Sequence, residues 1–224
     1  MPDKSIDIIT QTTLYVQNTL KNDSSHDWWH IYRVWKNAKF IGQYEKANLL
    51  VVELAALLHD IADWKFHNGD LKAGARITRG WLLENDIDSE TIDHVCHIVE
   101  NTSFKGANVN PEPLTLEGLI VQDADRLDAI GAIGIARAFA YGGHKGRSMY
   151  EPDIKPQLHN SFEEYKSNQS PTINHFYEKL LLLKDNMNTQ TGKLLAERKH
   201  NFMEQYLQEF YTEWETNYSA GNIS

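Results

Sequence analysis

The sequence predicts an all-α protein. Apolar residues recur at three- and four-residue steps almost throughout, and no two alternating apolar runs are joined by a hairpin turn. Glycine and proline number only 13 and 6 of 224 residues, whereas average usage of the two together is about 12%. The chain is long enough to bury a sizeable core, and we expect a single domain over residues 1–224.

The first half of the chain is expected to contain five helices. The first is capped by Ser5, and the second by Asp27. Residues 47–58 are apolar on nearly every side, which indicates a central, buried helix. Helical spacing then predicts a fourth helix over about 70–85 and a fifth that begins at Ser89.

Glycines mark the middle of the chain. A sixth helix follows Pro113, after which Gly131 and Gly134 are expected to loosen the chain before a short helix that ends near Tyr141. Residues 141–156 contain further glycines and two prolines. They are expected to form a surface loop whose glycine-rich, basic part could close over phosphates.

Two helices are expected to close the chain and to form a C-terminal extension over about 157–218. Ser170 caps the first, with Pro171 at its first position, and the second runs over about 189–218. The last helix carries aromatic residues at four-residue steps, from Phe202 to Trp214. This stripe is expected in the core, and it could also form the interface of a homodimer.

Charge and cysteine content exclude several classes of protein. Lysine and arginine number 22 against 31 acidic residues, a net charge of −9, which argues against a nucleic-acid or membrane partner. The single cysteine, Cys96, excludes an intramolecular disulfide and a zinc ribbon. No stretch approaches the ~20 apolar residues of a membrane span, and no signal peptide precedes the first helix. We therefore expect a cytoplasmic protein.

His59 and Asp60 end the apolar run that closes the third helix. Both side chains are expected to be largely buried, and burying a carboxylate without a partner costs several kcal/mol. A metal cation or a charged hydrogen-bond partner would offset that cost. Alternatively, His59 caps the helix carbonyls while Asp60 begins a turn.

His30 lies off the apolar stripe of the second helix, with Arg33 on the same face. A histidine and an arginine that face one way suit a metal ion beside a bound phosphate. The alternative is a solvated helix face.

Three acids, Asp123, Asp125 and Asp128, lie within six residues of a largely apolar helix. Asp125 and Asp128 share a face, whereas Asp123 lies roughly 200° around the helix from Asp125. One face therefore cannot present all three acids to one ion. The alternative is a set of salt bridges with Arg126, together with capping of the segment after Gly131.

These residues together resemble the H…HD…D signature of HD-domain metal-dependent phosphohydrolases. The stretches "HDWWH", "LLHDIAD", "SFKG" and "QDADRLDAIGAIGIARAF" are similar to a branch of small bacterial single-domain HD proteins. Members of that branch are known or proposed to hydrolyse nucleotides, including nucleoside triphosphates to monophosphate and pyrophosphate. The resemblance covers about residues 20–150 and implies an HD-domain helical bundle with additional C-terminal helices.

The resemblance implies a metal site with four ligands, His30, His59, Asp60 and Asp125. Asp123 then packs between helices or supports a ligand, and it is the alternative to Asp125. One divalent transition metal ion is expected, with Mn²⁺ favoured over Ni²⁺, Co²⁺, Fe²⁺ and Zn²⁺. A site with two metals would need helper histidines near the end of the fifth helix, where the sequence has Asn101, Thr102 and Ser103 instead, despite His94 and His97 earlier in that helix.

Other polar residues are expected to act as general bases or to bind the substrate. Asp63 and Asp128 are candidate general bases. Arg33, Lys65 and Lys105 are candidate phosphate clamps, although either lysine could equally be a solvated surface charge. His26 is a candidate substrate contact.

The expected function is hydrolysis of a small nucleotide by a metal-activated water. Two alternatives remain: a 5′-nucleotidase-type phosphomonoesterase, and a non-catalytic regulatory HD module that binds a nucleotide.

Overall fold

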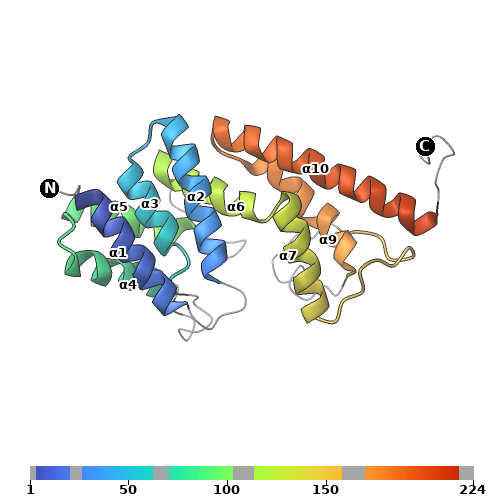
Figure 1. Ribbon diagram of the computed structural model, residues 1–224, viewed down its shortest axis with the longest axis horizontal. Coiled ribbons are helices and arrows are strands. Elements are labelled where there is room, and N and C mark those ends of the chain that lie inside the picture. Colours follow the sequence, from blue (N-terminus) through green and yellow to red (C-terminus); the bar gives the residue numbers. More distant parts are fainter. Residues whose placement is uncertain are drawn as a thin grey trace. The chain divides into compact units, whose positions relative to one another are not determined.

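The computed structural model describes residues 4–20, 27–62, 70, 72–102, 114–157 and 170–216 (Figure 1). Every regular element within these ranges is a helix, which confirms the all-α class. The helices form two compact units. Unit 1 comprises Met1–Asp128 and Asn188–Gly192, and unit 2 comprises Ala129–Met187 and Lys193–Ser224. The single domain expected over the whole chain stays a prediction.

Unit 1 contains six helices in its described residues, and α3 is the central one. Each residue of α3 from Val51 to Leu58 is buried, and this helix contacts α1, α2, α5 and α6. Its apolar character on all sides therefore follows from having neighbours on all sides. The six helices are α1 (Lys4–Thr19), α2 (Trp28–Glu45), α3 (Leu49–Leu58), α4 (Ala73–Glu84), α5 (Ser89–Thr102) and α6 (Leu116–Asp128).

Side-chain caps determine where two of these helices begin. Asp27 caps α2 as expected, and its Oδ1 accepts a hydrogen bond of 2.8 Å from the His30 amide. Asn48 caps α3, because its Oδ1 accepts from the Leu50 amide. The helix expected over 47–58 therefore begins at Leu49. The expectation that Ser5 caps α1 is wrong, because Ser5 lies within the helix.

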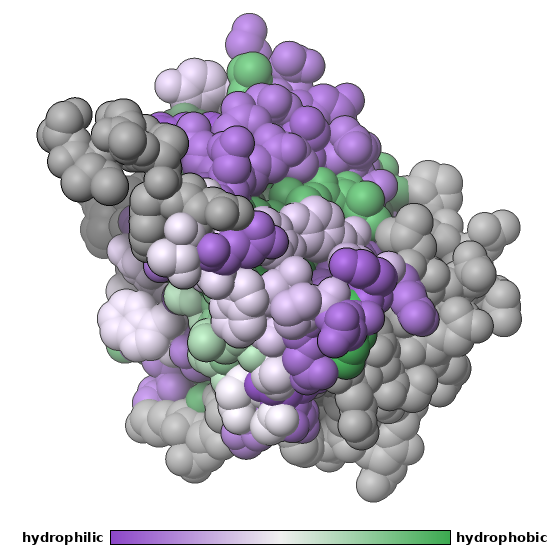
Figure 2. Space-filling model, turned by 90° about the vertical axis from the view of Figure 1, so that its right-hand side faces the viewer, coloured by the Kyte–Doolittle hydropathy of each residue, from purple (hydrophilic) through white to green (hydrophobic). Residues whose placement is uncertain are grey.

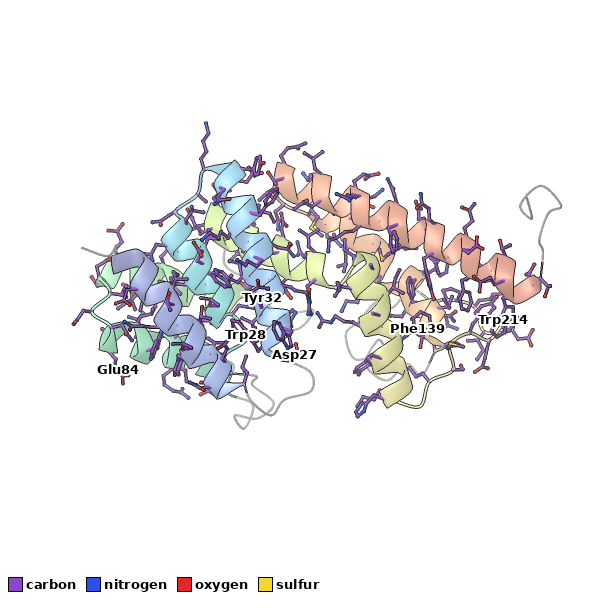
Figure 3. The ribbon with its side chains drawn as sticks, in the orientation of Figure 1. Asp27, Trp28, Tyr32, Glu84, Phe139 and Trp214 are labelled. Carbon is purple, nitrogen blue, oxygen red and sulfur yellow. The ribbon has the colours of Figure 1, made fainter. Side chains whose placement is uncertain are left out.

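Unit 2 contains α7 (Gly131–His144), α9 (Thr172–Glu178), a 3-10 helix η2 (Leu180–Asn186) and most of α10 (Gln190–Glu215). Aromatic rings fill its interior: Phe176 is fully buried, and its ring stacks on Tyr206 of α10 and contacts Phe139 of α7. Figure 3 labels Phe139 on α7 and Trp214 in the last turns of α10. The aromatic stripe of α10 is thus only partly core, since Phe202 and Trp214 remain about half exposed.

Several expectations for unit 2 are wrong in detail. Gly131 and Gly134 do not loosen the chain: α7 begins at Gly131, whose φ of +75° suits glycine, and includes Gly134. The same helix continues to His144 and so contains the start of the expected 141–156 loop. Pro171 caps α9 instead of being its first residue, and the Ser170 hydroxyl donates to Glu178.

Among the described residues, no helix is both long enough and apolar enough to cross a bilayer. Hydrophilic side chains cover most of the upper part of the face that Figure 2 displays, and apolar side chains appear below them in smaller patches.

Candidate metal centre

His30 occupies the first turn of α2 and points inward. Asp27 and Trp28 lie at the start of this helix, with Tyr32 one turn further along (Figure 3). His30 is only 5% exposed, so the alternative of a solvated helix face is excluded. Helix α2 packs against α3 and α6, and this packing brings His30 close to the residues that end both of those helices.

His59 follows the last residue of α3 and is equally buried, at 5% exposure. Its Nδ1 lies 2.8 Å from the carbonyl oxygen of Ala56. A carbonyl can only accept, so Nδ1 carries the proton and Nε2 presents its lone pair. Part of the alternative interpretation is therefore correct: His59 does cap a helix carbonyl. The same bond directs its other nitrogen away from the helix.

Acidic side chains surround the Nε2 atoms of these two histidines. Asp60 Oδ2 lies 3.5 Å from His59 Nε2 and 3.7 Å from His30 Nε2. Asp125 Oδ1 lies 3.5 Å from His30 Nε2. Ligand atoms of His30, His59 and Asp60 all lie within 4.8 Å of one another. Asp125 does not belong to that mutually close group among the described residues, and its side chain is 45% exposed.

The donor atoms fit a divalent transition metal ion. His59 Nε2 is buried and has no hydrogen-bond partner among the described residues, although a buried polar nitrogen ordinarily has one. Imidazole nitrogens and carboxylate oxygens are ligands that Mn²⁺, Fe²⁺, Co²⁺, Ni²⁺ and Zn²⁺ accept. His30, His59 and Asp60 could therefore hold a metal ion.

The electrostatics of the cluster favour a cation. Burial by itself would lower the pKa of His30, but hydrogen bonds to Asp128 and Asp60, with the charges of Asp125 and Asp60, raise this pKa to about 9. The surrounding acids thus stabilise positive charge at the point that Nε2 faces.

Asp128 contacts Nδ1 of the His30 ring, whereas Asp60 lies near the other nitrogen, Nε2. Asp128 Oδ2 is 2.7 Å from His30 Nδ1, and its Oδ1 accepts a 2.6 Å hydrogen bond from Arg33 Nε. The carboxylate is only 2% exposed. Both oxygens of the Asp128 carboxylate thus accept hydrogen bonds, two of them from Arg33. The general base expected at Asp128 and the phosphate clamp expected at Arg33 stay predictions.

Asp123 faces a different part of unit 1. It is fully buried, its Oδ1 accepts from the amide of Asn188, and its Oδ2 accepts from the amide and hydroxyl of Thr189, each at 2.8 Å. Arg126 Nη1 lies 4.0 Å from it, as the salt-bridge alternative expects. Its contacts match the helix-packing role that the sequence suggests for it.

Several residues expected at the site lie outside the described residues: His26, Asp63, Lys65 and Lys105. The additional histidines of α5 are described and have other partners. His94 Nε2 lies 2.8 Å from the Thr115 hydroxyl, and His97 lies against Asn101. Neither belongs to the metal-binding group found in the described part of the chain.

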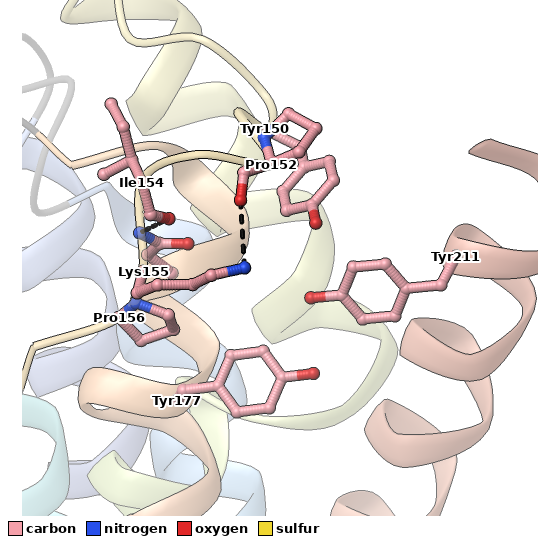
Figure 4. A pocket seen from close by; sticks show the side chains of 8 residues that line it. Tyr150, Pro152, Ile154, Lys155, Pro156, Tyr177 and Tyr211 are labelled. Carbon is pink, nitrogen blue, oxygen red and sulfur yellow. Dashed lines mark hydrogen bonds between the residues drawn. The ribbon is translucent and has the colours of Figure 1, made fainter. Parts of the chain in front are cut away.

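Two pockets in the described residues lie elsewhere. One, of about 250 Å³ in unit 2, is lined by Tyr150, Tyr177 and Tyr211 with Lys155 (Figure 4). Another, open to solvent in unit 1, is lined by residues of α1 together with Trp81. The candidate centre is recognised by its ligand atoms.

Comparison with known proteins identifies a family and several relatives to which this chain is similar. A family model of the HD domain matches residues 28–130, which include all of the metal-ligand candidates. YpgQ of Bacillus subtilis (strain 168) is 41% identical over 201 residues, covering 89% of this chain and 90% of YpgQ. Protein L803 of Acanthamoeba polyphaga mimivirus is 31% identical over 209 residues, covering 81% of this chain and 85% of L803.

Solved structures agree over a longer part of the chain. The crystal structure of an HD-superfamily hydrolase from Bacillus thuringiensis matches with a TM-score of 0.77 and 44% identity, covering 94% of this chain and 98% of that one. The structure of Bacillus subtilis YpgQ in complex with ADP matches with a TM-score of 0.74 and 38% identity, covering 94% of this chain and 97% of that one.

Proposed function

The chain belongs to the HD-domain family, and from that premise we propose that it is a metal-dependent hydrolase that converts a nucleoside triphosphate to a monophosphate and pyrophosphate. The observation that carries the proposal is the convergence of His30 Nε2, His59 Nε2 and Asp60 Oδ2 at one largely buried point. The fold of an HD-superfamily hydrolase supports metal-dependent phosphohydrolysis. The ADP bound to YpgQ supports a nucleotide as the substrate class.

We propose His30, His59, Asp60 and Asp125 as the ligands and Mn²⁺ as the metal. Two imidazoles and two carboxylates would hold the ion and would leave it able to bind water and a phosphate oxygen as well. When bound, a divalent ion supplies Lewis acidity, which lowers the pKa of a water molecule and polarises a phosphoryl oxygen. Asp125 is the ligand candidate most open to solvent, with its side chain 45% exposed, so we place the substrate on its side of the centre.

The reaction needs a base and countercharges for the phosphates. The water oxygen forms a bond to the α-phosphorus, and pyrophosphate leaves with the oxygen that bridged the α- and β-phosphates. The proton of the water passes to a base, for which we propose Asp63, one turn beyond the HD pair in sequence. His26, Lys65 and Lys105 are proposed substrate contacts, since cations offset the charge on the departing pyrophosphate.

A substrate panel tests this proposal. Purified protein with Mn²⁺ is incubated with nucleoside mono-, di- and triphosphates, and orthophosphate and pyrophosphate are measured separately. We expect pyrophosphate from triphosphates, and strong loss of this activity in Asp60→Asn, which keeps the side chain's size but removes its charge. Equal activity in the variant would contradict the assignment of the site.

The same panel separates the alternatives. Orthophosphate from monophosphates would identify a 5′-nucleotidase-type phosphomonoesterase that uses the same ligands. Metal and nucleotide binding without turnover of any substrate would identify a regulatory module.

A further inference from the structure

We propose that Asp128, held in place by Arg33, is a positioning residue that orients the His30 ring so that Nε2 faces the metal. The inference rests on the proposed function, because it assigns His30 as a ligand. It gives Asp128 a different role from the general base that the sequence suggests.

The geometry fixes which nitrogen of His30 is available. The Asp128 carboxylate accepts from Nδ1 at 2.7 Å, and the second ring nitrogen, Nε2, points outward in a different direction. Nε2 therefore faces Asp60 and Asp125, at 3.7 and 3.5 Å. A ligand histidine commonly donates its second N–H to a carboxylate or carbonyl, which sets its tautomer and orientation and raises its basicity.

Arg33 in turn fixes Asp128. Its Nε donates to Oδ1 at 2.6 Å and its Nη2 donates to Oδ2 at 3.0 Å. These two bonds hold the carboxylate plane, and the guanidinium charge compensates for burying the carboxylate. Arg33 and His30 lie one turn apart on α2, whereas Asp128 is the last residue of α6. The bonds thus tie the ligand to both helices.

The Nδ1 atoms of the two histidines have different kinds of hydrogen-bond partner, and each bond orients the imidazole ring. His59 Nδ1 lies 2.8 Å from a backbone carbonyl, that of Ala56, which no side-chain substitution removes. His30 depends on a side chain from another helix, so a single substitution at Asp128 isolates the contribution of this orientation to metal binding.

The test is the affinity of the full-length protein for Mn²⁺, measured by calorimetry and by the electron paramagnetic resonance of free Mn²⁺. We expect Asp128→Asn to weaken binding about 10- to 100-fold, the usual cost of losing such a partner. Asp123→Asn is the matched control. It alters the other fully buried aspartate of α6, which binds Asn188 and Thr189 instead, so it should lower stability and leave Mn²⁺ affinity unchanged.

Combining Asp128→Asn with His30→Ala shows whether Asp128 affects Mn²⁺ affinity through His30. In His30→Ala, measured with Mn²⁺ up to millimolar concentrations, adding Asp128→Asn should produce no further loss of affinity. Should Asp128→Asn fail to fold, Arg33→Met replaces it, because Arg33 is partly exposed, and a loss of affinity in the same direction is expected. Thermal melts of every variant verify folding.

The outcomes of this test are distinct. Wild-type affinity in a folded Asp128→Asn protein would overturn the positioning role while leaving the proposed function intact. An additional loss in the His30→Ala background would also overturn it, since Asp128 would then act by another route. No Mn²⁺ binding by the wild type would overturn the proposed metal centre itself.

Discussion

The candidate centre depends on hydrogen bonds made by atoms that would not touch a metal ion. Both histidines use Nδ1 for such a bond, to Asp128 Oδ2 in one case and to the Ala56 carbonyl in the other. Each bond leaves Nε2 at the centre, and that of His59 has no hydrogen-bond partner in the described part of the chain. A cation at this point would give the buried His59 Nε2 a partner.

Metal-dependent stabilisation tests this point. At a Mn²⁺ concentration about 100 times Kd, binding stabilises the native state by about 2.7 kcal/mol. For a chain of this length, that should raise the Tm by roughly 5–10 °C. His59→Leu should lose the shift in a thermal melt, whereas His94→Gln, which alters a histidine bonded to Thr115, should keep it. An unchanged shift in His59→Leu would show that the metal binds elsewhere.

His175 in unit 2 is expected to make the stability of the protein depend on pH. Burial and the nearby charges of Lys179 and Arg147 lower its pKa from 6.5 to about 4. The folded protein therefore binds this proton less readily than the unfolded chain does. The stability contribution is complete above pH 6.5 and is lost as pH falls from 6.5 towards 4.

Denaturant titrations check this linkage. Between pH 7 and pH 5, the free energy of unfolding of the wild type should fall by about 2 kcal/mol more than that of His175→Gln. His144→Gln, at an exposed position of α7, should behave like the wild type. The same pH dependence in His175→Gln as in the wild type would assign the effect to another group.

The features that could be predicted were those indicated by neighbouring residues in the sequence. Burial of His59 followed from the apolar run before it, and Asp27 was recognised as a cap. The partners of Asp123 were not predictable, because they are 65 and 66 residues away and no local pattern pairs them. The partners of Asp128 were not predictable either, because His30 and Arg33 lie 98 and 95 residues away on another helix.

Among the helix ends, the cap at Asp27 was predicted correctly, whereas the caps expected at Ser5 and Ser170 and the glycine-rich ends were not. The expected start of α5 at Ser89 is confirmed. In contrast, α7 contains four glycines and remains helical to His144. Two of these glycines make close approaches that a side chain would prevent, to Ala129 at Gly134 and to Thr172 at Gly142. Such packing requirements cannot be read from glycine's low helix propensity.

Adjacent glycines of α7 provide a test of this explanation. A Cβ at Gly142 would collide with the Thr172 hydroxyl of α9, whereas a Cβ at Gly143 would meet nothing within 4 Å. Gly142→Ala should destabilise the protein by about 1–3 kcal/mol. Gly143→Ala should be neutral or stabilise it by up to about 1 kcal/mol, because alanine favours helix. Chemical denaturation measures both, and equal effects would contradict the packing explanation.

At the scale of the whole molecule, the family match and the structural match differ in extent. The HD model covers residues 28–130, which belong almost entirely to unit 1. The solved relatives match 94% of the chain, so the helices of unit 2 are also part of the framework that they share with it. The resemblance visible in the sequence stopped near residue 150, because beyond it the motifs give way to ordinary amphipathic helices.

Net charge bears on which phosphate compounds the proposed site would bind. At −9, the protein as a whole repels polyanions, so attraction of a nucleotide would be local to the proposed metal centre. A single-stranded oligonucleotide in excess should therefore neither be cleaved nor inhibit hydrolysis of a nucleoside triphosphate at physiological salt. Competitive inhibition by the oligonucleotide in a pyrophosphate-release assay would contradict this prediction.

The central claim is that hydrolysis takes place at a metal held by His30, His59 and Asp60. Its most direct test follows nucleoside triphosphate by phosphorus NMR, with wild type and His59→Ala compared in the presence of Mn²⁺ and of a chelator. We expect monophosphate and pyrophosphate from the wild type with Mn²⁺ alone, and a loss of at least about 100-fold in the variant. Equal turnover by His59→Ala, or turnover that persists in the chelator, would contradict it.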